Sequence, residues 1–225
     1  MRKNVLCTAI VLISAAVTVY AAHRIYQEHS EYREGVDSYS VLETYIKEPQ
    51  TEPIPEESKP EQDEMSENAI TWPVVDFVAL KIINSDCVAW IRIDGTEIDY
   101  PVVQGHDNSF YLKHLFGGEW NGAGCIFLDS HVEPDLSDRH SVLYGHHMKN
   151  GTMFSDIADY KDQTYYENHA TGMILTPTEN YRIEFFAGYV AGADDENAWK
   201  VTFATEDEYV DWLNETVGRS WFNSE

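Results

Sequence analysis

An uncharged run of 18 residues, from Val5 to Ala22, is the feature that most limits how this chain can fold. A helix needs about 20 predominantly apolar residues to cross a bilayer, so the run is close to that length. Arg2 and Lys3 precede it, and basic residues favour the cytoplasmic side of a membrane. We therefore expect a transmembrane signal-anchor at 5–22, with residues 1–4 in the cytoplasm and the remainder outside the cell.

A cleaved signal peptide is the alternative interpretation of the same run. Small residues, Ala15, Ala16, Ala21 and Ala22, lie near its end, as a cleavage site requires. The apolar core is long for a signal peptide, and we therefore favour an uncleaved anchor. Cys7 precedes most of the run, too early for a lipoprotein site, and is expected to be an apolar residue of the membrane helix.

Charge excludes one large class of partners. The chain of 225 residues carries 39 acidic and 15 basic side chains, for a formal net charge of -24. Nucleic acid is not an expected partner, because its phosphates are bound by Lys and Arg. A basic peptide or a cell-wall polymer suits an acidic protein better. With 43% hydrophobic residues, the chain can bury the core of one domain.

Two regions follow the apolar run before the composition becomes that of a globular protein. Residues 23–46 are polar with scattered aromatic side chains and could be helical. Residues 47–68 contain eight acidic residues and four of the eight prolines, a composition that stays extended rather than folding. We expect 23–68 to be an extracellular spacer, acidic and proline-rich from 47, and 69–225 to be the folded domain.

Alternation of apolar and polar residues predicts mainly β structure in this domain. The expected strands form a hairpin around Gly95-Thr96, which is ended by Pro101 and Gly105, and four further segments. They are Trp90–Asp94, Ile98–Val102, Cys125–Asp129, Ser141–Tyr144, Met173–Thr176 and Arg182–Ala191. Expected helices are Val74–Ile82, Asp107–Leu115 with Asp107 as N-cap, Met153–Tyr160, and one that begins at the Thr205–Glu208 capping box and stops at Gly218. About six strands with short connecting helices favour a barrel-like domain.

The densest polar cluster lies in Tyr144–Gly151, where an expected strand runs into Gly145 and then into His146 and His147. Histidine at a strand end can transfer protons near neutral pH. Adjacent residues of a strand point in opposite directions, so at most one histidine faces a given site. A packing role and a metal site are the alternatives, but no histidine spacing typical of zinc sites occurs, and we predict no metal.

Nucleophile candidates are few. Cys125 lies inside the apolar run Cys125–Leu128, and Cys87 lies between an expected helix and Trp90, so both are expected to be buried structural thiols. No serine-hydrolase motif occurs.

Five segments, in order, resemble the class B sortases of Gram-positive bacteria. They are Asn84-x-Asp86-x-x-x-Trp90-Ile91, Gly95-Thr96-x-Ile98-Asp99-Tyr100-Pro101-Val102-Val103-Gln104-Gly105, Asp107-Asn108-x-x-Tyr111-Leu112, Gly124-x-Ile126-Phe127-x-Asp129 and Tyr144-Gly145-His146-x-Met148-x-x-Gly151-x-Met153-Phe154. The resemblance runs from about Trp72 to the last residue, Glu225.

The resemblance implies a fold and a reaction. The fold is mainly β, a sortase-type closed barrel of eight strands with an N-terminal helix. The reaction is that of a cysteine transpeptidase without cofactor or metal. It cleaves an Asn-Pro-x-Thr-like sorting motif in a secreted protein and joins the product to an amine of a cell-wall peptidoglycan precursor or of a pilin. His146 matches the catalytic histidine, as general acid and base. Leu112 matches a leucine that lines the substrate groove, and His147 has no assigned role.

The sequence departs from the family in one respect. The family's nucleophile lies in a Thr-Leu-x-Thr-Cys strand, followed by an arginine on the next strand, and neither occurs here. We expect the domain to be incomplete at its C-terminus, and the 225 residues alone to be inactive and marginal in stability. A decayed, non-catalytic surface module that binds peptide is the alternative, and a metal-dependent surface hydrolase is a third hypothesis.

Overall fold

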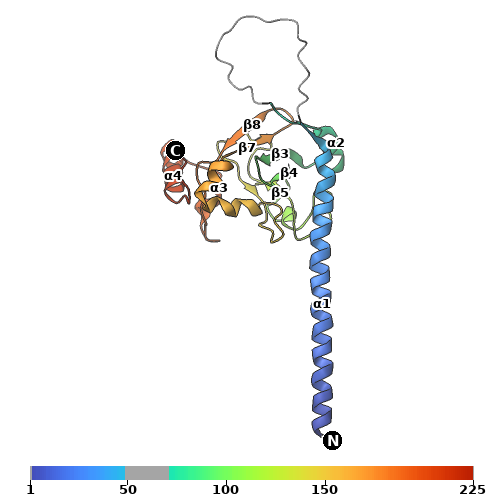
Figure 1. Cartoon of the computed structure of the whole chain (residues 1–225). Coiled ribbons are helices and arrows are strands. Elements are labelled where there is room, and N and C mark those ends of the chain that lie inside the picture. Colours follow the sequence, from blue (N-terminus) through green and yellow to red (C-terminus); the bar gives the residue numbers. More distant parts are fainter. Residues whose placement is uncertain (1, 49–70, 225) are drawn as a thin grey trace, which may run out of the picture.

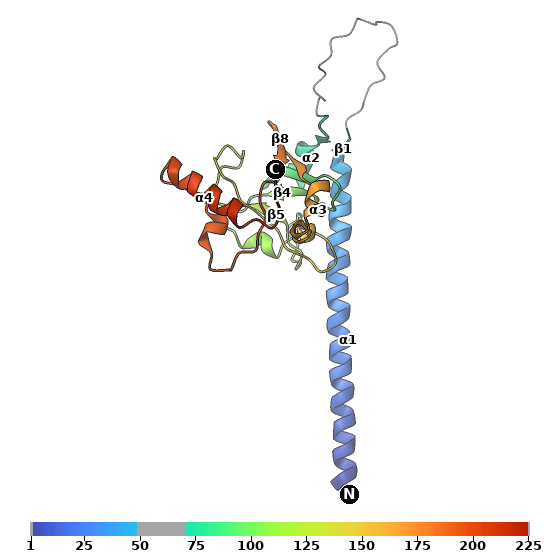
Figure 2. The same ribbon diagram turned by 60° about the vertical axis from the view of Figure 1, so that its left-hand side comes forward.

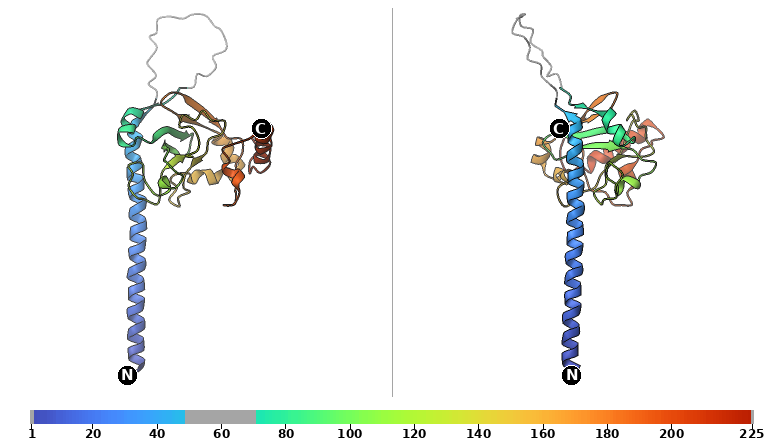
Figure 3. Two further views of the ribbon diagram at one scale, coloured as in Figure 1. Left: turned by 180° about the vertical axis from the view of Figure 1, so that it is seen from behind. Right: turned by 90° about the vertical axis from the view of Figure 1, so that its right-hand side faces the viewer.

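The structure, a computed structural model, describes residues 2–48 and 71–224, with side chains from residue 10 onward. A long helix, α1 (Arg2–Leu42), stands beside a small domain (Figure 1). The domain lies against the C-terminal part of α1, whereas the N-terminal part extends away from it in every view (Figures 2 and 3). By length and composition α1 could cross a membrane, and none of its apolar window is buried in the domain.

The C-terminal turns of α1 belong to the packed domain. Gly35, Tyr39 and Leu42 are buried, and their spacing places them on one face of the helix. The Tyr39 hydroxyl donates a hydrogen bond of 2.5 Å to the carbonyl of Gly124. The expected helical character of 23–46 is confirmed through Tyr45, because α1 is followed directly by the 3-10 turn η1 (Glu43–Tyr45).

A short pair of strands follows α1. Strand β1 (Ile46–Lys47) pairs antiparallel with β2 (Val74–Val75), so the two ends of the intervening segment meet at one place. The acidic, proline-rich residues of that segment lie outside the described residues. Within the expected spacer 23–68, residues 23–45 are helical, and the last turns of α1 pack against the domain. The start of the folded domain at residue 69, and the limits of the spacer, stay predictions.

The main sheet has six strands in the order β6-β5-β4-β3-β7-β8. All neighbours are antiparallel except β4 and β5, which run parallel. The strands are β3 (Cys87–Ile93), β4 (Asp99–Val103), β5 (Ile126–Leu128), β6 (Leu143–Tyr144), β7 (Thr171–Leu175) and β8 (Asn180–Glu184). The sheet confirms the predicted strands, including the hairpin of β3 and β4, whose turn places Gly95 at a positive φ of 75°.

Two details of the predicted strands are wrong. Pro101 does not end the hairpin but lies inside β4, paired with Trp90. It is tolerated because β5 pairs only with Val102 and Val103, so a missing N–H at Pro101 disrupts no bond on that side. The strand predicted over Arg182–Ala191 ends at Glu184.

The helices are shorter than predicted, except the last. The described helices of the domain are α2 (Phe77–Ile83), η2 (Phe110–Leu112), η3 (Ser155–Lys161), α3 (Gln163–Asn168), η4 (Glu196–Trp199) and α4 (Glu206–Gly218). The segments predicted as helices over Asp107–Leu115 and Met153–Tyr160 contain only 3-10 turns, and α3 was not predicted. At α4 the predicted cap is confirmed, since the Thr205 hydroxyl accepts the amide of Glu208. Helix α4 lies on the side of the domain away from α1 (Figures 1 and 2).

The hydrophobic core lies between the sheet, α2 and the end of α1. Its largest fully buried side chains are Trp90, Phe116, Phe127 and Leu80. The core therefore joins segments that are far apart in sequence, and it fixes the loops at the ends of β4, β5 and β6.

Candidate functional site

His146 lies just beyond the end of β6 and is half-buried. Its ring atom Nε2 is 2.7 Å from the carbonyl oxygen of Leu112. A carbonyl can only accept, so Nε2 carries the hydrogen and the neutral ring presents Nδ1 as its free acceptor. The structure thus brings together the two residues that the sequence resemblance singled out, through the backbone of one and the side chain of the other.

Gly145 allows the chain to leave β6 with His146 beside the carbonyl of Leu112. A Cβ at Gly145 would lie 2.6 Å from Cδ2 of Phe154 and would also overlap the side chain of Ile126. The amide of Phe154 donates to the carbonyl of His146 at 2.9 Å and holds the backbone on the other side. A residue without a side chain is therefore required immediately before the histidine.

The loop that carries Leu112 is fixed from both sides. The carboxylate of Asp107 accepts the amides of Ser109 and Phe110, which starts the 3-10 turn η2. The amide of Cys125 donates to the carbonyl of Tyr111 at 2.9 Å. These bonds leave the neighbouring carbonyl of Leu112 facing His146.

Asp129, buried at the end of β5, links this loop to β6. Its Oδ2 accepts hydrogen bonds from Asn108 at 2.8 Å and from Tyr144 at 2.7 Å, and its Oδ1 accepts from the backbone and ring of His131. Burial alone would raise the pKa of Asp129, but the hydrogen bonds from Tyr144, His131 and Asn108 outweigh it, and the pKa lies below the ordinary value. Sequence reasoning gave Asp129 no role, although an acid directly after the apolar run Cys125–Leu128 was a signal for a buried, hydrogen-bonded carboxylate.

His147 points away from this site, as alternation along a strand predicts. It is exposed and pairs with Met153 in an isolated bridge. It lines a cleft of about 730 Å³ together with Phe154, Phe185 and Phe222, and His146 is not among the lining residues. The side chains of His146 and His147 therefore lie on different surfaces of the domain.

Both cysteines of the domain are structural, as predicted. Cys87 and Cys125 are buried and unpaired. Burial raises the pKa of each thiol to about 12, and the sulfur of Cys125 lies 3.2 Å from the Tyr39 hydroxyl oxygen. Neither thiol is a reactive nucleophile, because reactive cysteines are exposed and have a lowered pKa.

Two further histidines of the domain bond backbone carbonyls. His140 bonds the carbonyl of Lys200 through Nδ1, and His169 bonds that of Tyr165 in the same way. Across residues 10–48 and 71–224, no three His, Cys, Asp or Glu side chains converge as a metal site would require.

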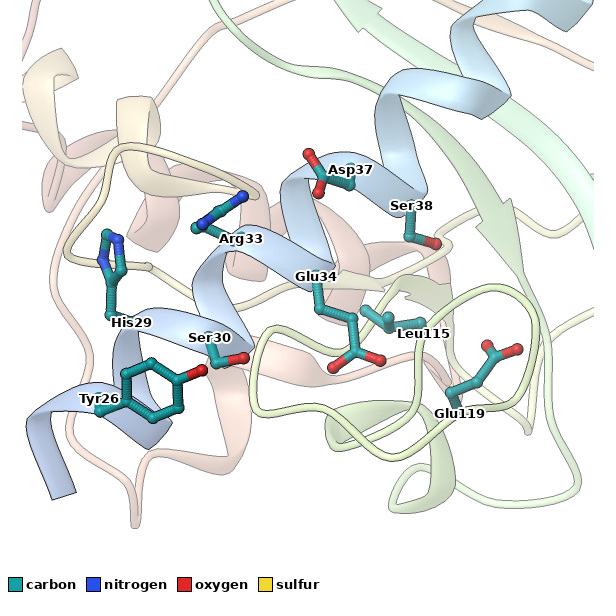
Figure 4. A pocket seen from close by; sticks show the side chains of 9 residues that line it. All are labelled: Tyr26, His29, Ser30, Arg33, Glu34, Asp37, Ser38, Leu115 and Glu119. Atoms are coloured by element: carbon teal, nitrogen blue, oxygen red, sulfur yellow. The ribbon is translucent and has the colours of Figure 1, made fainter. Parts of the chain in front are cut away.

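A second cleft, of about 650 Å³, lies between α1 and the loop after Leu112 (Figure 4). Tyr26, His29 and Arg33 line it from the helix, and Leu115 and Glu119 line it from the loop. His146 does not line this cleft either, so the cleft adjoins the candidate site without being part of it.

Comparison with known proteins identifies the family. The chain is 31% identical over 187 residues to sortase B of Staphylococcus aureus, which covers 83% of this chain and 76% of that protein. The chain belongs to the class B sortase family. It is also 34% identical over 145 residues to sortase B of Listeria monocytogenes, of which it spans 58%. No protein-family model matches the chain.

Solved structures of class B sortases agree with the fold. The crystal structure of the Staphylococcus aureus sortase B has a TM-score of 0.64 and 34% identity, over 66% of this chain and 70% of that one. Sortase B of Bacillus anthracis has a TM-score of 0.70 and 28% identity, over 88% and 85% of the two chains. The predicted sortase-type fold with an N-terminal apolar helix is thereby confirmed. The described strands form a curled half-barrel of six strands, from β6 to β8, rather than the closed barrel of eight that the resemblance implies.

Proposed function

We propose that this protein is a membrane-anchored sortase that cleaves an Asn-Pro-x-Thr-like sorting motif after Thr and joins the product to a cell-wall peptide amine. The observation that carries the proposal is the arrangement of His146 at the end of β6, hydrogen-bonded to Leu112 O in a chain of the class B sortase family. One sortase B structure of Staphylococcus aureus is a complex with substrate, which supports a peptide partner for the family.

His146 would move the protons of this reaction. With Nε2 engaged by Leu112 O, Nδ1 is the atom that exchanges protons. In the protonated ring Nδ1 can give its proton to the departing amine, and in the neutral ring that remains it can accept one from the incoming amine. Leu112 is 37% exposed, which leaves its side chain available to a bound peptide beside the histidine. These roles follow from position and chemistry, and each is part of the proposal.

The described residues supply no nucleophile for this reaction. The chemistry requires a thiolate, and the two described cysteines, Cys87 and Cys125, are buried and have raised pKa values. Cys7 lies in the apolar run. The proposed reaction therefore needs the family's cysteine and arginine strands, which this sequence does not contain, and we expect the 225 residues alone to be inactive.

The anchor is α1. Its apolar stretch suits a bilayer, and Arg2 and Lys3 at its start favour a cytoplasmic N-terminus, which would put the sortase domain on the outer face of the cell membrane. A secreted protein that carries a sorting motif and an amine of the cell wall would meet the enzyme there.

A peptide-cleavage assay tests the proposal. The substrate is a fluorophore–quencher peptide that contains Asn-Pro-x-Thr, and it is offered to the 225-residue chain and to the product of the reading frame continued past codon 225. We expect turnover by the continued product, loss of turnover in His146→Ala, and none by the shorter chain. A stop codon directly after position 225, or turnover unaffected by His146→Ala, would favour the non-catalytic module instead.

A further inference from the structure

The loop after Leu112 is a small hairpin, Lys113–Asn121. The amide of Leu115 donates to Glu119 O at 2.8 Å, and the amide of Asn121 donates to Lys113 O at 2.9 Å. Between these bonds His114 faces Trp120 across the hairpin. Directly opposed residues of this kind have side chains on the same side, about 5 Å apart at Cβ.

Aromatic side chains are exposed on this hairpin. Trp120 is 58% exposed and Phe110, just before the hairpin, is 44% exposed. The ring of Phe110 stacks on that of His114 with centroids 4.0 Å apart. Trp is enriched where proteins meet the membrane–water interface.

The hairpin is attached to the helix that we propose as the anchor. The side-chain amide of buried Asn121 donates to the carbonyl of Glu31 at 3.0 Å. A Cβ at Gly35 would lie 3.4 Å from Cβ of Ala123, so helix and loop are in close contact one turn later. The hairpin therefore has a fixed height along α1.

That height is close to the membrane surface. Glu31 lies nine residues beyond Ala22, the end of the apolar run, which is a rise of about 14 Å in an α-helix. Tyr26, only four residues beyond Ala22, still lines the cleft shared with Glu119 of the hairpin (Figure 4), a rise of about 6 Å. The polar layer on each side of a bilayer is about 5–8 Å thick. A hairpin at this level can reach it.

Other loops beside α1 lie further from the apolar run. Asn150 and Thr152 share a cleft with α1 that begins at Tyr32, six residues later than Tyr26. Tyr20 and Tyr26 are themselves exposed on α1 on either side of Ala22, where a belt of interfacial aromatic residues is expected.

We propose that the hairpin Lys113–Asn121 rests on the outer surface of the bilayer that α1 crosses, with Trp120 in the lipid headgroup layer. The proposal rests on the membrane anchor proposed above. The occupant of this surface is lipid rather than a second protein, because the hairpin is tied to the anchor at a height that brings it to the bilayer. His146 bonds the residue directly before the hairpin, so the candidate site opens next to the membrane.

Site-directed fluorescence tests this arrangement in the full chain. Cys7 is replaced by Ser, and an environment-sensitive fluorophore is attached at position 119 through Glu119→Cys. Cys87 and Cys125 are buried and stay unlabelled. The matched control is Val78→Cys on α2, an exposed position (76%) at the end of the domain away from the N-terminal part of α1 (Figure 1).

Both proteins are placed in phosphatidylglycerol–phosphatidylcholine vesicles that contain a headgroup-labelled nitroxide lipid. We expect quenching at position 119 to be several-fold stronger than at position 78. Equal and weak quenching at both positions, in protein that floats with the vesicles, would overturn the proposal while leaving the anchor intact. Protein that does not float with the vesicles would overturn the anchor itself, and the two failures are thereby distinguished.

Discussion

Asn121 donates a hydrogen bond of 3.0 Å from Nδ2 to the backbone carbonyl of Glu31 and so joins α1 to the loop beside His146. Its Oδ1 accepts the amide of Ala123 at 2.9 Å, and its own amide donates to Lys113 O. The Asn121 side chain thus holds α1, the hairpin and the segment that follows in a single arrangement.

Replacing Asn121 by Ala should destabilise the domain. The change leaves the buried amide of Ala123 without its acceptor and removes the bond to Glu31, at a cost of about 2–3 kcal/mol for buried unsatisfied groups. Denaturant unfolding of the full chain in detergent measures this free energy. Asn214→Ala, at an exposed position of α4, is the control and should change it little. Equal effects of the two changes would mean that Asn121 does not join helix and loop.

Gly145→Ala should displace the end of β6. The added methyl would lie 2.6 Å from the ring of Phe154, and overpacking of this kind costs about 1–3 kcal/mol. Gly218→Ala at the end of α4 meets nothing within 4 Å and is the matched control. The free energy of unfolding, and the chemical shifts of the His146 ring, should change in the first variant only. A normal His146 spectrum in Gly145→Ala would contradict the steric account.

Ionisation of Asp129 should make the free energy of unfolding depend on pH in the acid range. Its pKa in the folded protein lies below the ordinary value of 3.8. A carboxyl group of this kind stabilises the fold fully above the unfolded-state pKa, and the contribution is lost as the pH falls through the folded-state pKa. Unfolding free energies should therefore decrease as the pH drops below about 3.8.

Asp129→Asn is expected to lose this part of the pH dependence and about 2–3 kcal/mol at neutral pH, because charge-assisted bonds to Tyr144, Asn108 and His131 become weaker or unfavourable. Asp211→Asn on the exposed surface of α4 is the control. An acid-denaturation curve of Asp129→Asn with the wild-type slope would refute the assignment.

Cys87 and Cys125 should resist alkylation in the native protein. Burial raises the pKa of both thiols to about 12, so iodoacetamide should label neither between about pH 7 and 9, where an ordinary thiol becomes progressively more reactive. The introduced thiol of Val78→Cys should be labelled rapidly in the same sample. Mass spectrometry of peptides reports each site, and rapid native labelling of Cys125 would reopen its candidacy as a nucleophile.

Local patterns made much of this fold predictable. The alternation of residue types through Trp90–Asp94 and Ile98–Val102 predicted the β3–β4 hairpin, because successive side chains of a strand point to opposite faces of the sheet. The Thr205–Glu208 capping box gave the start of α4, because a cap depends only on neighbouring residues.

Non-local pairing was not predictable in the same way. Strands β1 and β2 have two residues each and meet across the segment between Lys47 and Val74, so neither leaves a periodic signal. The burial of Tyr39 in the domain core likewise depends on Gly124, which is 85 residues away. The contact between the end of α1 and the domain could for this reason not be predicted from the sequence around Tyr39.

In the candidate site, too, the residues were predictable from the sequence but the contacts between them were not. The resemblance singled out His146 and Leu112, but the bond between them uses a backbone carbonyl, which any residue supplies and no motif records. Asp129 was visible as part of a motif, yet its bonds to Asn108 and Tyr144 depend on the fold.

The tautomer of His146 follows from the same bond and can be measured. Since Leu112 O accepts from Nε2, the neutral ring should carry its hydrogen on Nε2 and leave Nδ1 bare. His140 and His169 provide the opposite case, because each bonds a backbone carbonyl through Nδ1 and should carry its hydrogen there. Long-range ¹H–¹⁵N spectra of ¹⁵N-histidine-labelled protein at about pH 9, well above the ordinary imidazole pKa, distinguish the two forms. His146→Ala, His140→Ala and His169→Ala assign the signals. A bare Nε2 on His146 would mean that the bond to Leu112 is not formed in solution, and Nδ1 would then lose its place as the proton-transferring atom of the proposed reaction.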